Sequence, residues 1–238
     1  MVREDADVET SSDDYARRFA GSAGRWFLER QSSATGELLA GFQPGMRVLD
    51  VGGGHAQLLP LTVARGFDVT VLGSDPSCAG RLAPWLDAGR CRFASGDLSE
   101  LPFDSRSFDL VLSFRLLPHL HDWRRVAGEL CRVARRSVVV DYPSTRSVNV
   151  LAGRLFGLKR RIEENTRPFA LFAPGEIAEA FSASGFRVAA ARPQFFFPMA
   201  LHRLHGSALG ARALEAAPRL LGLTRRLGSP VIVRADRV

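Results

Sequence analysis

Short apolar runs alternate with amphipathic segments along the middle of the chain. The runs with the length and composition of buried strands lie at residues 46–51, 67–72, 90–94, 107–113 and 137–141. Helical periodicity fills the intervals at 55–65, 77–87 and 122–134, with Asp122 as a plausible N-cap. Strands that alternate with helices predict right-handed crossovers and a parallel sheet covered on both faces, so we expect an α/β fold.

The two flanks of this core follow other patterns. Residues 1–12 are polar and predict a frayed tail, and helical spacing resumes at 13–20 and 25–41. After Asp141 the pattern is mixed as far as residue 172. The elements expected beyond it are a helix at 174–184, a strand at 186–191, a helical stretch at 207–227 that Pro218 should kink or split, and a last strand at 230–235.

Composition places the chain among ordinary globular proteins. Hydrophobic residues make up 46% of the 238 residues and charged residues 24%. No apolar run approaches the roughly 18 residues of a spanning helix, and the acidic N-terminus lacks a secretory apolar region. The three cysteines are widely spaced, which supports neither a disulfide framework nor a zinc site and fits a reducing cytoplasm. We therefore expect a cytoplasmic protein.

The net charge of +7 is concentrated in the C-terminal half. A basic surface favours anionic partners such as phosphates, lipid headgroups or acidic substrates. The basic residues are too dispersed to indicate nucleic acid, so no nucleic-acid partner is expected.

The most informative segment is the glycine corner, Asp50-Val51-Gly52-Gly53-Gly54-His55-Ala56, where a strand turns into a helix start. Glycines let a backbone pass close to a ligand, and a helix N-terminus offers free N–H groups. Dinucleotide folds use Gly-x-Gly-x-x-Gly here, but Gln57 takes the place of the last glycine.

The acid before the glycines, Asp50-x-Gly52-x-Gly54, resembles the first motif of class I S-adenosylmethionine-dependent methyltransferases. Asp75 follows the second strand and Gly96-Asp97-Leu98 the third, as in that family. The similarity covers residues 45–142, and the middle of the chain also looks like the ubiquinone and menaquinone biosynthesis-type methyltransferases.

This resemblance implies a Rossmann-like, seven-stranded, mostly parallel sheet. Its last strand would be antiparallel and inserted beside the fifth, and the strands near 186 and 230 would form the closing pair. Residues 1–42 would be the tail and helical lid, and residues 43–238 the methyltransferase domain. S-adenosylmethionine would be the cofactor, with Asp75 on its ribose and Asp97 on its adenine amino group. The implied cofactor-binding residues are Asp50, Gly52, Gly54, His55, Asp75, Pro76, Asp97, Leu98, Ser113 and Arg115.

Methyl transfer from such a cofactor needs few catalytic groups from the protein. The sulfonium already activates the methyl group, so the protein must align the acceptor and exclude water. A hydroxyl or acidic carbon acceptor would need a base, and His119 is the candidate, ahead of His121. The alternative is that both are helix-cap or surface residues. No carboxylate cage for a metal is visible after the fourth strand.

Acceptor recognition should fall to residues outside the sheet. We expect the insertion at about 142–172 and the segment 195–227 to contribute, with Tyr15, Arg18, Trp26 and Phe196 as candidate substrate-binding residues. Aromatic walls with arginines suit a small organic or lipid-like acceptor with an anionic group. Equally, the aromatic residues could be core packing. The stretch 207–227 could touch a membrane surface or simply cover the domain.

The predicted activity is methyl transfer to an O or C atom of such an acceptor. The alternatives are a nicotinamide-dependent oxidoreductase, which the residue at Gln57 argues against, and a non-catalytic module that keeps the cofactor. A nucleic-acid methyltransferase is a weaker option.

Overall fold

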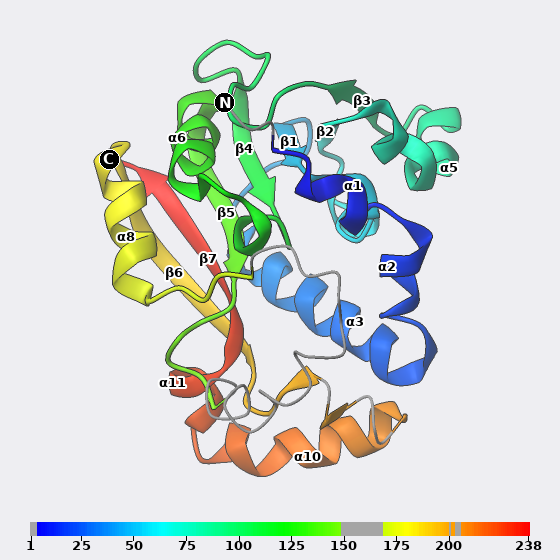
Figure 1. The fold of residues 1–238 in the computed structure, drawn as a ribbon, viewed down its shortest axis with the longest axis vertical. Coiled ribbons are helices and arrows are strands. Elements are labelled where there is room, and N and C mark those ends of the chain that lie inside the picture. The colour runs from blue at the N-terminus through cyan, green and yellow to red at the C-terminus, as the bar shows by residue number, and fades with distance from the viewer. Residues whose placement is uncertain (1–3, 149–168, 200, 203–205) are drawn as a thin grey trace.

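The computed structural model describes residues 4–148, 169–199, 201–202 and 206–238. These residues form a seven-stranded sheet in the order β3-β2-β1-β4-β5-β7-β6, with helices on both faces (Figure 1). Most of the insertion expected at 142–172, residues 149–168, lies outside the described residues.

The sheet is parallel except for its closing strands. Its strands are β1 (Arg47–Val51), β2 (Asp68–Gly73), β3 (Arg92–Ser95), β4 (Phe108–Ser113), β5 (Ala134–Tyr142), β6 (Phe186–Phe195) and β7 (Ser229–Arg237). Strand β7 runs antiparallel to both β5 and β6, between which it lies. The expected Rossmann-like sheet with an antiparallel last strand is therefore confirmed.

Helices fill the connections at nearly the expected places. The described helices are α1 (Ala6–Thr10), α2 (Asp13–Arg17), α3 (Gly21–Leu38), η1 (Gly53–His55), α4 (Leu59–Ala64), η2 (Pro76–Leu82), α5 (Ala83–Asp87), η3 (Leu117–His119), α6 (Trp123–Val133), α8 (Pro174–Ala183), α10 (Ala208–Leu220) and α11 (Leu223–Leu227). The last helical stretch is split, but at Gly222 rather than at Pro218. Gly222 adopts φ +69°, a left-handed conformation that glycine accepts without strain.

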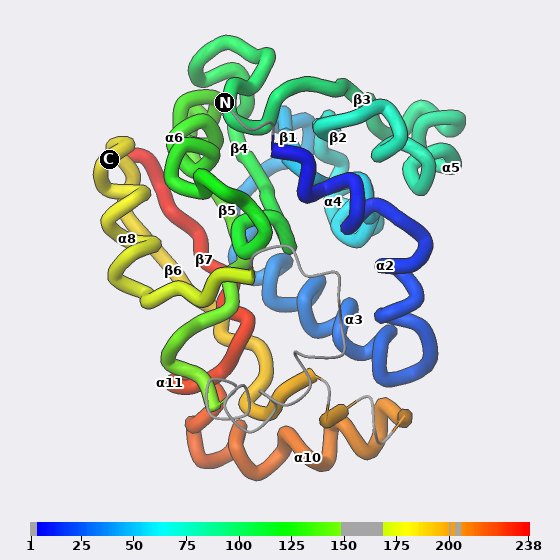
Figure 2. Tube along the Cα trace, viewed as in Figure 1, coloured from blue at the N-terminus to red at the C-terminus, as the bar shows by residue number. Residues whose placement is uncertain are grey.

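The expectation of a frayed tail at residues 1–12 is wrong for the part described. Residues 6–10 form α1, and Ala6, Asp7 and Thr10 are buried. Ser12 then caps α2, accepting a hydrogen bond from the N–H of Tyr15. Helix α1 is too short and too polar for a hydrophobic period to reveal it, because its contacts with the domain are largely made by polar side chains. Figure 2 follows the chain from α1 through α2 and back along α3.

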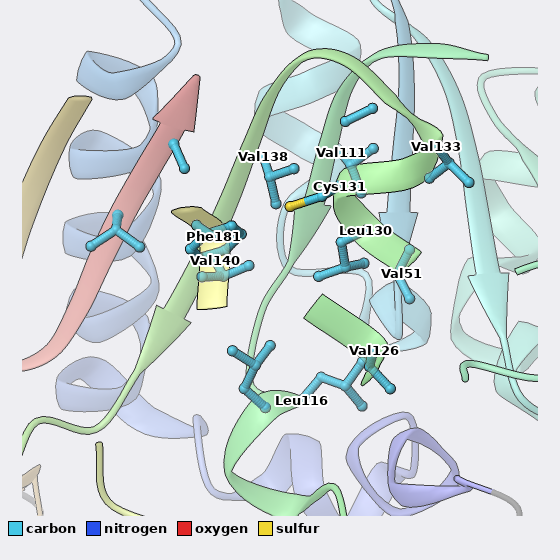
Figure 3. Close-up of a cluster of buried hydrophobic side chains, with 14 of the residues drawn as sticks. Val51, Val111, Leu116, Val126, Leu130, Cys131, Val133, Val138, Val140 and Phe181 are labelled. Atoms are coloured by element: carbon cyan, nitrogen blue, oxygen red, sulfur yellow. The ribbon is translucent and has the colours of Figure 1, made fainter. Parts of the chain in front are cut away.

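Two apolar clusters cover the two faces of the sheet. On one face, Val111, Val138 and Val140 pack against Leu130 of α6 and Phe181 of α8 (Figure 3). The other face carries residues of α3 and α4 on the same central strands. Each fully buried side chain of this kind contributes about 1.5–3 kcal/mol, so these clusters hold the strand ends in register. None of the described helices is long and apolar enough to cross a membrane.

Candidate functional site

Three acidic residues lie at or just beyond the carboxyl-terminal ends of adjacent parallel strands, which form one edge of the sheet. Asp50 lies near the end of β1, beside Val71 of β2. Strands β2 and β3 end together at the pair Gly73 and Ser95. Asp75 and Asp97 each follow two residues later, so all three belong to the carboxyl edge of adjacent parallel strands, where ligands of open α/β sheets bind.

The glycine corner is shaped around the carboxylate of Asp50. Gly52 has φ +73°, which turns the chain sharply out of β1. A Cβ at Gly53 would stand 2.3 Å from the Asp50 carboxyl carbon, and one at Gly54 would stand 2.2 Å from Ser11 Oγ. Neither position can carry a side chain without moving its neighbours.

Asp50 is buried without a compensating partner on one oxygen. Its Oδ1 has no hydrogen-bond partner among the described residues, and the same holds for Ser113 Oγ at the end of β4. Burial raises the pKa of Asp50 to about 7. A carboxylate and a hydroxyl left in this state suit a ligand that brings a donor or a positive charge.

His55 is buried and neutral. Its Nδ1 accepts a hydrogen bond from the N–H of Gln57. Burial, with the nearby Arg115, lowers the pKa of His55 to about 3. The ring is therefore part of the corner's wall and is not placed to act as a base near neutral pH.

Asp75 and Asp97 organise the loops after their strands. Asp75 Oδ1 accepts from the N–H of Ser77 at 2.9 Å. Asp97 Oδ1 accepts from the N–H of Ser99 at 2.8 Å and from its hydroxyl at 2.7 Å. Of the two residues that directly follow these acids, Pro76 is exposed and Leu98 is fully buried. The turn-forming role that both acids could have is thus present, and it uses the Oδ1 atom of each.

Arg115 joins the site to helix α3. Its guanidinium donates to Gln57 Oε1 at 2.8 Å and to Gln31 Oε1 at 2.5 Å, and it stacks over the ring of Phe19. Its backbone N–H donates to the buried carboxylate of Asp141. Gln31, Gln57 and Asp141 were not among the predicted site residues, since only the fold brings them to Arg115.

The N-terminal segment also reaches this edge, which the sequence did not predict. Asp7 is fully buried, and its Oδ2 accepts from the N–H of Ser74 at 2.7 Å, just after β2. Glu4 accepts from the N–H groups of His121 and Asp122 at the start of α6. Nothing in the local sequence distinguishes these two acids from the other acidic residues at the N-terminus.

The predicted catalytic residue and the predicted substrate-binding residues have different neighbours. His119 is half-buried in η3, with its ring 5.6 Å from that of Phe169. Tyr15 and Trp26 are buried in one aromatic cluster, while Arg18 is exposed and lies over the Tyr15 ring. Phe196 donates its N–H to Glu215. The four substrate-binding candidates therefore lie in or beside this aromatic cluster, and they do not line the cavity at the glycine corner described next.

A cavity of about 1000 Å³ opens between α3 and the glycine corner. Its apolar wall is formed by Phe19, Leu28, Ala56, Pro60 and Leu61. The charged lining has three arginines, which are Arg25, Arg65 and Arg81, and two glutamates, which are Glu29 and Glu37. It touches the corner at His55, Ala56 and Gln57, so a molecule in it would lie beside a ligand bound at the corner.

These residues fit the nucleoside cofactor that the motifs imply. The glycine corner offers close backbone approach, Asp50 and Ser113 offer atoms that need partners, and two further acids stand at the neighbouring strand ends. A dinucleotide would need close approach where Gln57 stands, and that side chain is held by Arg115. The arrangement favours a mononucleoside over a dinucleotide.

Comparison with known proteins agrees with this assignment. A family model described as a methyltransferase domain matches residues 25–191. A sterol 24-C-methyltransferase of Gibberella zeae is 31% identical over 102 residues, which are 40% of this chain and 26% of that enzyme. The match therefore spans about a quarter of that relative's length.

Solved structures share the whole fold. The magnesium protoporphyrin IX methyltransferase of Synechocystis PCC 6803, with bound SAH, superposes with a TM-score of 0.69 at 17% identity, over 99% of this chain and 98% of that one. A geranyl diphosphate methyltransferase in complex with SAM gives 0.61 at 16% identity, over 87% and 84%. The chain belongs to the methyltransferase-domain family and is a class I methyltransferase whose cofactor is S-adenosylmethionine.

Proposed function

We propose that this enzyme methylates an O or C atom of a small organic or lipid-like acceptor that carries an anionic group. The cavity between α3 and the glycine corner carries the proposal. Its volume of about 1000 Å³ and its aliphatic and aromatic wall suit a large apolar molecule. Arg65 donates to the carbonyls of Gly36 and Leu39, and Arg81 pairs with Asp13. Arg25 is therefore the lining arginine that would bind a carboxylate or phosphate.

The acceptors named for the relatives support this choice. They are a sterol, a magnesium porphyrin and geranyl diphosphate, which are all largely apolar. The last of them also carries phosphate groups, a combination that matches a cavity with an apolar wall and an arginine-containing lining.

In this proposal the cofactor supplies an electrophilic methyl group, and the chain positions and shields it. Gly52 and Gly54 permit close approach, with Asp50, His55, Ser113 and Arg115 around the amino-acid end. Asp75 and Pro76 contact the ribose, and Asp97 and Leu98 the adenine. His119 accepts the proton of a hydroxyl acceptor, as its half-buried place after β4 allows.

Replacing Asp97 with asparagine should weaken cofactor binding and leave the loop folded. The introduced amide keeps the Oδ1 acceptor that Ser99 uses, but it turns an NH₂ donor toward the adenine amino group. Two facing donors cost about 1–3 kcal/mol, or roughly 5–150-fold in the dissociation constant of S-adenosylhomocysteine. Calorimetric titration measures this, and unchanged affinity would remove Asp97 from the site. Asp104→Asn, in the loop before β4, is the matched control.

Filling the cavity should block the acceptor and spare the cofactor. Leu61→Trp places an indole in the apolar wall, so turnover of apolar acceptors should fall at least about tenfold. Turnover is measured as transfer of a labelled methyl group to a panel of isoprenoid, sterol, porphyrin and aromatic acids. Leu209→Trp, at a position that is 79% exposed on α10, should change nothing.

The same assay separates the cavity from the proposed base. His119→Ala should lower turnover of a hydroxyl acceptor at saturation and leave cofactor affinity intact, because the residue would act only on the proton.

A Leu61→Trp enzyme with undiminished turnover on every active acceptor would place acceptor binding elsewhere.

A further inference from the structure

The N-terminal segment 4–12 lies on the atoms that the cofactor needs. A Cβ added at Gly54 would lie 2.2 Å from Ser11 Oγ. A Cβ added at Gly52 would lie 3.5 Å from the Cβ of Asp7. Helix α1 contacts both η1 and η2, the two turns that follow β1 and β2. In Figure 1, α1 lies beside the ends of these strands.

Different residues of the segment 4–12 contact different loops at the carboxyl-terminal ends of the strands. Ala6 packs in the same apolar cluster as Leu98, the residue placed beside the adenine. Asp7 takes the N–H of Ser74 at 2.7 Å and contacts the Cys78 thiol at 3.4 Å, next to the ribose acid Asp75. The segment thus contacts the turns after β1 and β2, where the proposed site places the methionine and ribose ends of the cofactor.

The segment is held by contacts that can be given up. Helix α1 has five residues and no side-chain cap at its N-terminus, so it has little stability of its own. Asp7 is fully buried, yet its Oδ1 has no hydrogen-bond partner among the described residues. The hydrogen bond from Ser74 to the other oxygen is therefore the charged contact that holds the segment, and its loss favours release.

We propose that residues 4–12 form an intrasteric plug that competes with S-adenosylmethionine for the cleft and must leave before the cofactor binds. The proposal rests on the cofactor assignment made above. It differs from a lid, which would close over a bound cofactor and add contacts to it. With a plug, the measured dissociation constant is the intrinsic one divided by the fraction of molecules that are open.

The first test compares affinity for S-adenosylhomocysteine in the full-length chain. Asp7→Ala removes the charge-assisted hydrogen bond to Ser74 and should tighten binding by about tenfold. Asp5→Ala removes the same charge from an exposed position on the same segment, and should leave affinity within about twofold. Equal affinities for wild type and Asp7→Ala would overturn the plug while leaving the methyltransferase assignment in place.

The second test needs no variant, so it stands even where Asp7→Ala folds poorly. Hydrogen exchange of the wild-type amides at residues 6–12 should become faster as S-adenosylhomocysteine is added, because the ligand expels the segment. A lid would show the opposite sign, with slower exchange, and that result would overturn the proposal. Absence of binding to wild type and Asp7→Ala alike would instead overturn the cofactor assignment, and the plug with it.

Discussion

Gly53→Ala is expected to destabilise the protein and to weaken cofactor binding at the same time. The added Cβ would lie 2.3 Å from both the carboxyl carbon and Oδ2 of Asp50, which is 1% exposed. Because Asp50 is enclosed by the core, the carboxylate cannot swing aside freely. Overpacking of this kind costs about 1–3 kcal/mol.

The loss of affinity follows from the same displacement. In the proposed site the Asp50 carboxylate faces the charged end of the cofactor, and the added Cβ would push it away. One charge-assisted contact is worth about 1.5–3 kcal/mol, or at least about tenfold in the dissociation constant. Urea unfolding and calorimetric titration measure the two effects.

Gly80→Ala is the matched control for this prediction. A Cβ at Gly80 would meet nothing within 4 Å, and the residue lies in η2, close to the same edge. This variant should retain wild-type stability and affinity. If Gly53→Ala behaved in the same way, the corner would be looser than its geometry indicates.

Asp50→Asn is expected to make the cofactor-free protein more stable above pH 7. Burial raises the pKa of Asp50 from 3.8 to about 7 in the folded protein. The unfolded chain therefore loses this proton near pH 4, while the folded protein keeps it until about pH 7. Stability falls as pH rises between these two values, and the ionised folded state bears the full cost above them.

The size of this effect is up to about 4 kcal/mol, given by the separation of the two pKa values. Asparagine is neutral throughout, so the variant should match the wild type near pH 4 and exceed it near pH 8. Urea unfolding at both values measures the difference. Asp87→Asn, at an exposed position, makes the same chemical change and should show no such trend. The prediction would be contradicted if the free energies of unfolding of wild type and Asp50→Asn differed by the same amount at both pH values.

Asp50→Asn should weaken cofactor binding, although it makes the cofactor-free protein more stable. A cationic ligand beside the carboxylate favours its ionised form, so binding near pH 7 should release a proton from the wild type and none from the variant. Affinity should fall in the variant although its stability rises. This opposition is typical of a functional site that is strained without its ligand.

Local sequence was sufficient for the parallel strands and for the acids at their carboxyl ends, whereas the antiparallel closing strand was implied by the family resemblance. Strands β1, β2, β4 and β5 were predictable because each contains a short apolar run. Asp50, Asp75 and Asp97 could be found because each lies at or just beyond the end of such a run, and parallel strands bring their carboxyl ends to one edge. The cofactor class came from the family resemblance that these acids and the glycine corner carry.

The contacts that complete the site join residues far apart in the chain. Arg115 reaches Gln31 and Gln57 across 84 and 58 positions, and Asp7 reaches Ser74 across 67. No periodic pattern reports such pairs. The order of residues was enough to predict the individual strands and the glycine corner, since each of these is a local pattern along the chain. The three-dimensional fold was needed to reveal that α3 walls a cavity at the corner and that the acidic N-terminal segment packs against the turns after β1 and β2. Both depend on how buried polar groups find partners across the fold.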